Sequence, residues 1–268
     1  MKIRFGCSGW SYKSWIGGFY KAGTREADFL KLYSQVYDMV EIDSTFYGIP
    51  EPGSVRKWHD STPDSFSFFP KMPRIITHEK SLINSENELE NFLFSIGHLK
   101  EKLGYILIQL PPKFSFSKGF DSLRSFLKVL PETNRFAVEF RDNSWYREEV
   151  YSMLKNLNVV LAWADRRGSN TQCIVTSKDI YLRLIGDRLL PEDRFGTILR
   201  DKSMNIRRWI EELAISKDMV ENAYVFANNH YQGFGPGTIN LFRELMGMNR
   251  LIMPAELSAD SKGQKTLF

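Results

Sequence analysis

The chain has 268 residues, of which 43% are hydrophobic and 25% are charged, and its net charge is +4. A chain of this size can bury one large core, and no Gly/Ser/Pro-rich linker divides it, so we predict one domain over residues 1–268. No apolar run approaches the ~20 residues of a membrane span, and the N-terminus enters a strand-like segment at once, which predicts no membrane partner and no signal peptide. Two cysteines, Cys7 and Cys173, are too few for a disulfide framework, which favours the cytoplasm.

Strand-like and helix-like stretches alternate along the chain. Short apolar runs predict strands at residues 3–5, 39–42, 66–69, 105–110, 136–140, 159–163, 180–184 and 224–226. Helical periodicity predicts helices near residues 24–37, 85–102, 122–129, 147–157, 205–216 and 238–247. Strands that alternate with helices in this way predict an α/β fold, a single (β/α)8 TIM-type barrel. A doubly wound open sheet is the alternative, although no dinucleotide-binding glycine motif opens a helix after the first strand.

Polar side chains recur where the predicted strands end. They are Ser8, Trp10, Glu41, Asp43, Lys71, Gln109, Glu139, Arg141, Asp165, Arg183, Asn228, Asn229 and His230. In a barrel the carboxyl ends of the strands meet at one face, so these residues predict a charged pocket there. The simpler alternative is that Glu41 and Arg183, or Glu139 and Arg141, only satisfy each other as ion pairs.

An enzyme is the first functional hypothesis, a hydrolase or isomerase of a phosphorylated, sugar-like or nucleic-acid substrate. Glu41 and Glu139 would be its acid/base pair, and Lys71 and Asp165 complete the predicted catalytic set. The predicted substrate-binding residues supply anion-binding, hydrogen-bonding and stacking groups: Trp10, Tyr47, Gln109, Arg141, Trp145, Arg183, Asn228, Asn229 and His230. The glycine-rich loop at 228–238 precedes a predicted helix, whose free N–H groups could receive an anion.

Metal and nucleophilic chemistry have weaker support. The four histidines form no HExxH motif, and no paired CxxC motif is present. One Mg²⁺ or Mn²⁺ held by the oxygens of Glu41, Glu139 and Asp165 stays open. Cys7 at the end of the first strand lacks an identifiable partner.

Two further classes of function compete with the enzyme. The protein could bind nucleic acid or a nucleotide without turnover, as the basic balance and the aromatic loops suggest. It could also be a scaffold on a barrel that has lost its activity. The oligomeric state cannot be read from the sequence.

Seven motifs follow one another in the order GCSGWSYKSWIGGFY, VEIDSTFY, WHDSTP, THEKSL, QLPPKF, AVEFRDNSW and FANNHYQGFGP. Together they resemble the YecE-like family, known as domain of unknown function 72, across essentially the whole chain. The resemblance implies a single (β/α)8 barrel and no particular reaction. The family pattern usually has Asn where this chain has Asp43, which adds a negative charge at the predicted pocket.

Overall fold

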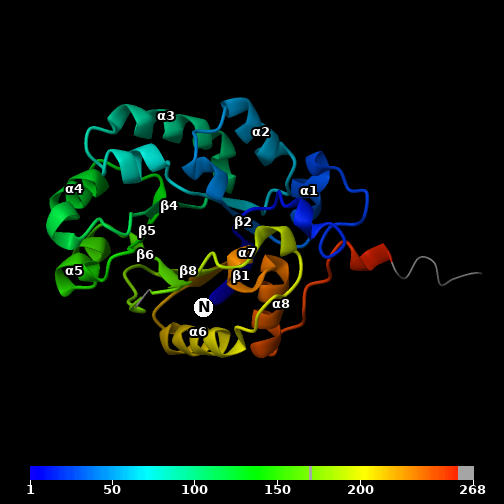
Figure 1. The fold of residues 1–268 in the computed structure, drawn as a ribbon. Coiled ribbons are helices and arrows are strands. Elements are labelled where there is room, and N and C mark those ends of the chain that lie inside the picture. The colour runs from blue at the N-terminus through cyan, green and yellow to red at the C-terminus, as the bar shows by residue number, and fades with distance from the viewer. Residues whose placement is uncertain (169–170, 259–268) are drawn as a thin grey trace, which may run out of the picture.

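The computed structural model describes residues 1–168 and 171–258 of the chain (Figure 1). Its strands are β1 (Lys2–Cys7), β2 (Met39–Ile42), β3 (Ser67–Pro70), β4 (Tyr105–Gln109), β5 (Arg135–Glu139), β6 (Val160–Leu161), β7 (Trp163–Arg166), β8 (Asp179–Gly186) and β9 (Asn222–Ala227). Every pair of neighbouring strands in these sheets is parallel. The predicted alternation of parallel strands and helices is therefore confirmed.

The strands form three hydrogen-bonded sheets, with the orders β1-β9-β8-β7, β2-β3 and β4-β5-β6. Isolated parallel bridges connect the sheets, one between Ser8 and Glu41 and another between Lys71 and Leu107. A complete, closed (β/α)8 barrel is not confirmed, because the ladders are interrupted between these sheets. The strand predicted at residues 159–163 is divided at Ala162, where β6 pairs with β5 and β7 pairs with β8.

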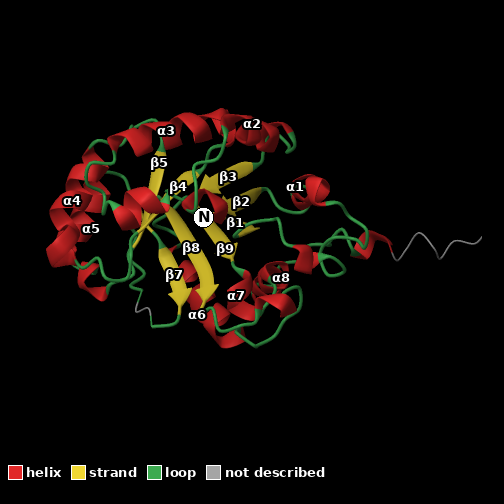
Figure 2. Ribbon diagram, turned by 45° about the horizontal axis from the view of Figure 1, so that its top comes forward, coloured by secondary structure: helices red, strands yellow, loops and turns green. Residues whose placement is uncertain are grey.

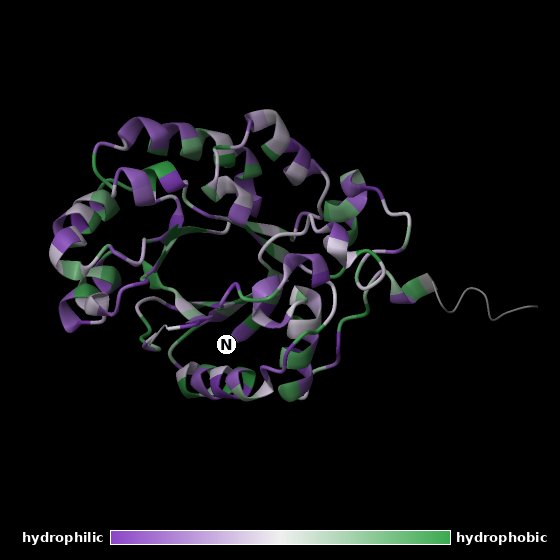
Figure 3. Cartoon of the chain, in the orientation of Figure 1, coloured by the Kyte–Doolittle hydropathy of each residue, from purple (hydrophilic) through white to green (hydrophobic). Residues whose placement is uncertain are grey.

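Helices surround the strands (Figures 1 and 2). They are α1 (Phe29–Tyr33), α2 (Pro52–Asp60), α3 (Glu86–Ile96), α4 (Phe116–Lys128), α5 (Glu148–Asn156), α6 (Ser203–Ser216), α7 (Asn229–Gln232) and α8 (Gly235–Leu245). Hydrophilic and hydrophobic segments alternate along them, as expected of helices with one face on a core (Figure 3). No helix within residues 1–168 and 171–258 is both long enough and apolar enough to cross a bilayer.

The helix predictions hold in most places and fail in three. The stretch predicted at 24–37 contains only a 3-10 turn, η2 (Glu26–Asp28), and the five-residue α1. The sequence analysis missed α2, which begins with Pro52 at a position where the absent N–H costs no hydrogen bond. The short α7 was also missed, because it lies inside the Gly-rich stretch that reads as a loop.

Two apolar cores lie on opposite faces of the strands. The larger core packs the strands against the helices. The smaller core consists of Met39, Phe69, Tyr105, Leu107, Ala137, Val160, Ala162, Tyr181, Tyr224 and Phe226, all from strands or the β6–β7 junction. Because side chains alternate between the faces of a strand, residues two positions beyond this inner core lie on its face as well. That rule places Glu41, Lys71, Gln109, Glu139 and Arg183 at the carboxyl-terminal end of the inner core.

Candidate ligand-binding pocket

A cavity of about 350 Å³ opens at the carboxyl ends of the strands. Its lining consists of Asp43, Phe46, Tyr47, Lys71, Arg74, His78, Gln109, Arg141, Arg166, Arg183, Ile185, Arg188, Asn228 and His230. Six of these residues are Lys or Arg, and Asp43 is the one carboxylate among the described lining residues. The pocket is therefore strongly basic, although the chain as a whole is only mildly so.

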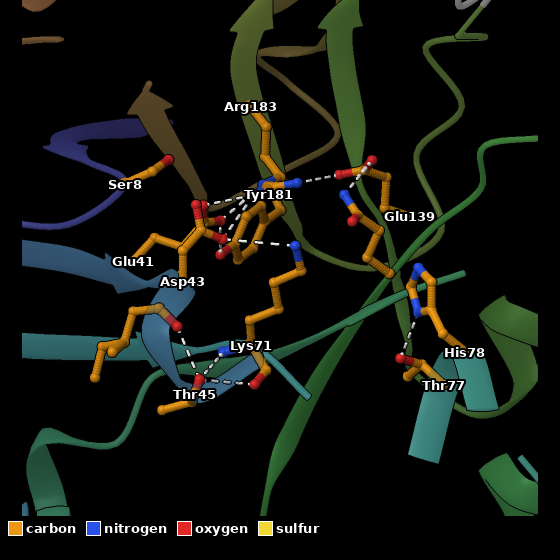
Figure 4. Close-up of polar contacts among 12 residues, drawn as sticks. Ser8, Glu41, Asp43, Thr45, Lys71, Thr77, His78, Glu139, Tyr181 and Arg183 are labelled. Atoms are coloured by element: carbon orange, nitrogen blue, oxygen red, sulfur yellow. Dashed lines mark hydrogen bonds and ion pairs between the residues drawn. The ribbon is translucent and has the colours of Figure 1, made fainter. Parts of the chain in front are cut away.

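Arg183 lines this pocket and binds both predicted acid/base residues (Figure 4). Its Nη2 is 2.6 Å from Glu41 Oε1 and its Nε is 2.7 Å from Glu41 Oε2. Its Nη1 also donates to Glu139 Oε2. All three side chains are buried, and neither glutamate is part of the pocket lining. The ion-pair alternative thus describes Glu41 and Arg183 correctly, whereas Glu139 pairs with Arg183 and not with Arg141.

Neighbouring polar groups complete the hydrogen bonds of the two glutamates. The Tyr181 hydroxyl donates to Glu41 Oε2 at 2.8 Å, and Gln109 Nε2 donates to Glu139 Oε1 at 2.8 Å. Burial alone would raise the pKa of Glu139, but Arg183, Lys71 and Gln109 together hold that pKa below its usual value. Burial opposes the charge of Arg183 as well, yet Glu41, Glu139 and Asp43 raise its pKa well above the usual range. We infer a stable ionic cluster with a structural role.

Lys71 and Asp43 face each other at the edge of that cluster. Lys71 Nζ is 3.6 Å from Asp43 Oδ1 and 4.2 Å from the centre of the Phe46 ring. Thr45 fixes the backbone of Lys71, because its hydroxyl accepts from the Lys71 N–H at 3.0 Å and donates to the Lys71 carbonyl at 2.7 Å. The DSTF turn η3 (Asp43–Phe46) therefore clamps the end of β3 and presents a carboxylate to the pocket.

Arg141, Arg166 and Arg188 line another part of the pocket. Arg166 donates through Nη2 to the backbone carbonyl of Arg141 at 2.9 Å. The Nε atoms of Arg141 and Arg166 are buried and have no hydrogen-bond partner among the described residues. Burial lowers the pKa of Arg141, and the nearby charge of Arg166 lowers it further. The unpartnered N–H donors and the positive charges of these arginines can therefore bind an anion.

Two histidines contribute neutral imidazoles to the lining. Burial, with the charges of Lys71, Arg141 and Arg74, lowers the pKa of His78 to about 4. Burial also lowers the pKa of His230, against the opposing effect of Glu192, whose Oε1 is 3.3 Å from its Nε2. His78 lies in a π-helical turn, η4 (Ile75–Glu79), a type of distortion that is frequent at functional sites.

Besides Glu41 and Glu139, four further predicted site residues do not line the pocket. Trp145 is fully buried and stacks on Phe140 with ring centres 4.7 Å apart, so it belongs to the outer core. Trp10 packs edge-to-face against Trp58 at 5.6 Å. The remaining two are Asp165 and Asn229.

Asp165 and Asn229 have structural partners instead. Asp165 Oδ2 accepts hydrogen bonds from Trp209 Nε1 and from the Tyr231 hydroxyl, both at 2.7 Å. Asn229 Oδ1 accepts from Trp15 Nε1 at 3.0 Å and from the backbone N–H of Gly235 at 2.9 Å. The predicted anion site at the start of α8 is therefore partly occupied by the chain's own amide oxygen.

Of the other predicted residues, Tyr47, Lys71, Gln109, Arg141, Arg183, Asn228 and His230 do meet in the pocket. The sequence analysis missed Arg74, His78, Arg166 and Arg188. Side chains alternate between the two faces of a strand, so every second residue lies on the same face. Ala162 belongs to the inner core, and counting on from it in steps of two predicts that Arg166 lies on the inner face as well. Asp165, at the odd position, points to the opposite face and to α6.

The predicted Mg²⁺ or Mn²⁺ ligands do not converge. Glu41 and Glu139 are bound to Arg183, while Asp165 is held by Trp209 and Tyr231. In the part of the chain that the structure describes, no group of three or more His, Cys, Asp or Glu side chains is arranged to hold a metal ion.

Fold and site together define an α/β protein of parallel strands with a basic pocket at their carboxyl ends. The chain belongs to the family described as "Protein of unknown function DUF72", which matches residues 4–262 and confirms the resemblance found in the sequence.

Curated relatives and solved structures agree with this assignment. The UPF0759 protein YecE of Escherichia coli O157:H7 is 28% identical over 181 residues, 67% of this chain, and the match spans only 61% of that relative's length. The UPF0759 protein YunF of Bacillus subtilis strain 168 is 28% identical over 236 residues, which are 86% of this chain and 80% of that protein.

A DUF72 family protein from Thermotoga maritima superposes with a TM-score of 0.77 at 29% identity, covering 92% of this chain and 98% of that one. One from Enterococcus faecalis gives 0.70 at 20% identity with the same coverage, which is a similarity of fold alone.

Proposed function

We propose that this protein binds the phosphate group of a phosphorylated, sugar-like substrate in the pocket and acts on that substrate as an enzyme. The charge of the lining carries the proposal, since six cationic side chains accompany a single carboxylate. Guanidinium groups match phosphate oxygens with bidentate hydrogen bonds. A cavity of about 350 Å³ is in the range of small-molecule sites.

We assign the acid/base chemistry to groups that line the pocket and not to Glu41 or Glu139. Asp43 Oδ1 is buried and accepts no hydrogen bond from the described residues, so it retains a lone pair for a proton. His78 and His230 stay neutral near pH 7, because their pKa values are lowered, so their imidazoles can take part in hydrogen bonds with a substrate without adding charge. Hydrolysis and isomerisation of the bound substrate are both compatible with this arrangement.

The proposal also treats the three sheets as one interrupted (β/α)8 barrel. The bridges at Ser8–Glu41 and Lys71–Leu107 support this view, as does the contact of β6 with β8. Active sites of such barrels lie at the carboxyl ends of the strands, where this pocket is found.

Nucleic-acid binding without turnover is the second candidate. Tyr47 lines the pocket while its side chain remains 72% exposed, so a base outside the cavity could stack on it. Arg74 and Arg188 add charge to the same lining. This alternative predicts affinity that falls steeply with salt and no product.

Calorimetric titration tests the proposed function. We expect inorganic phosphate and glucose 6-phosphate to bind and glucose not to bind. Arg141→Met should weaken phosphate binding by roughly tenfold, which corresponds to about 1.4 kcal/mol. Arg25→Met is the matched control, since the Arg25 side chain is 80% exposed and pairs with Asp28. Equal binding of glucose and its phosphate, or an unchanged affinity in Arg141→Met, would contradict the proposal.

A further inference from the structure

Lys71 places an unusual amine in the pocket. Its side chain is only 8% exposed and belongs to the cavity lining. Among the residues that the structure describes, the hydrogen bonds of Lys71 to side chains involve its backbone and Thr45, and Nζ donates none. The contacts of Nζ are Asp43 Oδ1 at 3.6 Å and the face of the Phe46 ring at 4.2 Å.

Lys102 shows what a structural buried lysine looks like in this protein. It is 2% exposed, and its Nζ donates to the carbonyls of His59 at 2.7 Å and of Thr62 at 2.8 Å. Lys71 has no such acceptors, and burial together with the charge of Arg183 lowers its pKa against the opposing charges of Asp43, Glu139 and Glu41. A lysine with a lowered pKa has a larger fraction of neutral amine, which is the nucleophilic form.

We propose that Lys71 forms an imine with the carbonyl carbon of a phosphorylated aldehyde or ketone, which defines the substrate class of this pocket. The inference rests on the proposed function, because the arginines of the lining must hold the phosphate group. It gives Lys71 a covalent role in place of a purely electrostatic one. Arg141 and Arg166, with their unpartnered Nε atoms, supply donors for the phosphate in the same cavity.

The chemical step balances without an oxidant or a cofactor. The lone pair of Nζ forms a bond to the carbonyl carbon, and the carbonyl oxygen becomes a hydroxyl group. Asp43, 3.6 Å from Nζ, transfers the first amine proton to the carbonyl oxygen, which makes it a hydroxyl group, and then transfers the second amine proton to that hydroxyl group. Both amine hydrogens and the oxygen then leave as one water molecule, and a C=N bond remains.

The imine narrows the class of reaction. Once protonated, it withdraws electrons from the adjacent carbon, so a C–H or C–C bond beside the former carbonyl is weakened. Isomerisation or carbon–carbon cleavage follows from such an intermediate, and hydrolysis of a phosphate ester does not. Asp43 is the carboxylate of the described lining that can take up the released proton.

Reductive trapping tests this inference. The purified protein is incubated with pyridoxal 5′-phosphate, an aldehyde that carries a phosphate group, then reduced with borohydride, digested and analysed by mass spectrometry. We expect saturable labelling of Lys71 that excess inorganic phosphate suppresses, and no labelling of Lys102 in the same digest. Labelling that is confined to exposed lysines would overturn the inference.

Lys71→Arg separates the covalent role from the binding role. Arginine keeps the positive charge but does not form the imine, so this variant should lose the adduct. Arg25→Met, at an exposed ion pair outside the pocket, should keep both the adduct on Lys71 and the affinity for inorganic phosphate. Wild-type protein that binds phosphate without an adduct on Lys71 refutes the imine and leaves the proposed function standing. Wild-type protein that binds no phosphate refutes the proposed function itself.

Discussion

Arg183 binds Glu41 through both carboxylate oxygens, with Nη2 2.6 Å from Oε1 and Nε 2.7 Å from Oε2. The two residues come from β8 and β2, so this bidentate pair connects strands of different sheets. Its geometry explains why the pocket above it is basic. Glu41 and Glu139 are bound to Arg183 and do not line the pocket, so Asp43 is the one carboxylate among its described lining residues.

Arg183→Met should destabilise the protein strongly. The substitution leaves Glu41 and Glu139 buried without their cation, and loss of one partner from a buried pair costs about 3–5 kcal/mol. Urea unfolding followed by circular dichroism measures the change. Arg25→Met, at an exposed ion pair, should leave the unfolding midpoint unchanged. A small effect of Arg183→Met would mean that the ionic cluster contributes little to the fold.

Glu139→Gln distinguishes a structural carboxylate from a catalytic acid. We expect a loss of about 3 kcal/mol in stability, because the variant breaks the ion pair with Arg183 inside the fold. The lowered pKa of Glu139 means that the unfolded chain takes up this proton first as the pH falls through its ordinary value of 4.5. Wild-type stability should therefore decline on acidification more steeply than that of the variant. Unchanged stability, with loss of a measurable turnover, would restore the catalytic role.

Arg141→Met should not reduce stability and should increase the unfolding temperature, whereas Arg166→Met also loses the 2.9 Å hydrogen bond to the Arg141 carbonyl and should gain less. Each removes a cation with an unpartnered, buried Nε, and each relieves repulsion between the two guanidinium groups. Residues kept for binding often lower stability in this way. Thermal unfolding without ligand measures the effect. A marked decrease in either variant would show that these arginines support the fold.

His78 should make stability depend on pH. Its pKa is about 4 in the folded protein and 6.5 ordinarily, so between these values the unfolded chain binds a proton that the folded chain does not. The stability of the wild type should fall as the pH decreases from 6.5 to 4, and His78→Gln should remove that component. Because His78 is only half-buried, solvent screening makes the loss smaller than the shift implies. Urea midpoints of both proteins at several pH values provide the comparison, and parallel profiles would contradict it.

Asp165→Asn should lower the free energy of unfolding and leave the affinity for phosphate unchanged. Asp165 Oδ2 accepts hydrogen bonds from Trp209 and Tyr231, and a charged acceptor contributes about 1.5–3 kcal/mol per such bond. Calorimetry with inorganic phosphate and urea unfolding of the same preparation separate the two effects. A loss of phosphate affinity with unchanged stability would show that Asp165 takes part in binding.

The fold and half of the pocket could be predicted from strand ends alone. Apolar runs located the strands, and their final polar residues included Lys71, Gln109 and Arg183. Parity along the strand was the missing criterion. It separates Arg166 from Asp165, since neighbouring residues on a strand point to opposite faces. Asn228 and Asn229 lie beyond β9, at the N-cap and the first residue of α7, so parity does not apply to them. Trp145 lies outside the pocket for a different reason. An aromatic residue in a loop beside a charged strand end can equally fill the outer core, and Trp145 is fully buried there.

Other features depend on contacts that a sequence does not show. The pairing of Arg183 with Glu41 joins residues that are 142 positions apart. Glu139 binds Arg183 and not Arg141, and only the three-dimensional arrangement of the side chains shows this. Arg74 and His78 reach the pocket because a π-helical turn follows β3, where the sequence showed only a loop. The cytoplasmic location remains a prediction.

The most direct test of the account is a crystal structure of the protein soaked in tungstate, a phosphate analogue located by its anomalous scattering. The account predicts tungstate in the pocket, with oxygens within hydrogen-bonding distance of Arg141 and Arg166, and Glu41 and Glu139 still bound to Arg183. A pocket that remains empty while tungstate occupies other sites would contradict the assignment of this basic cavity as the phosphate site.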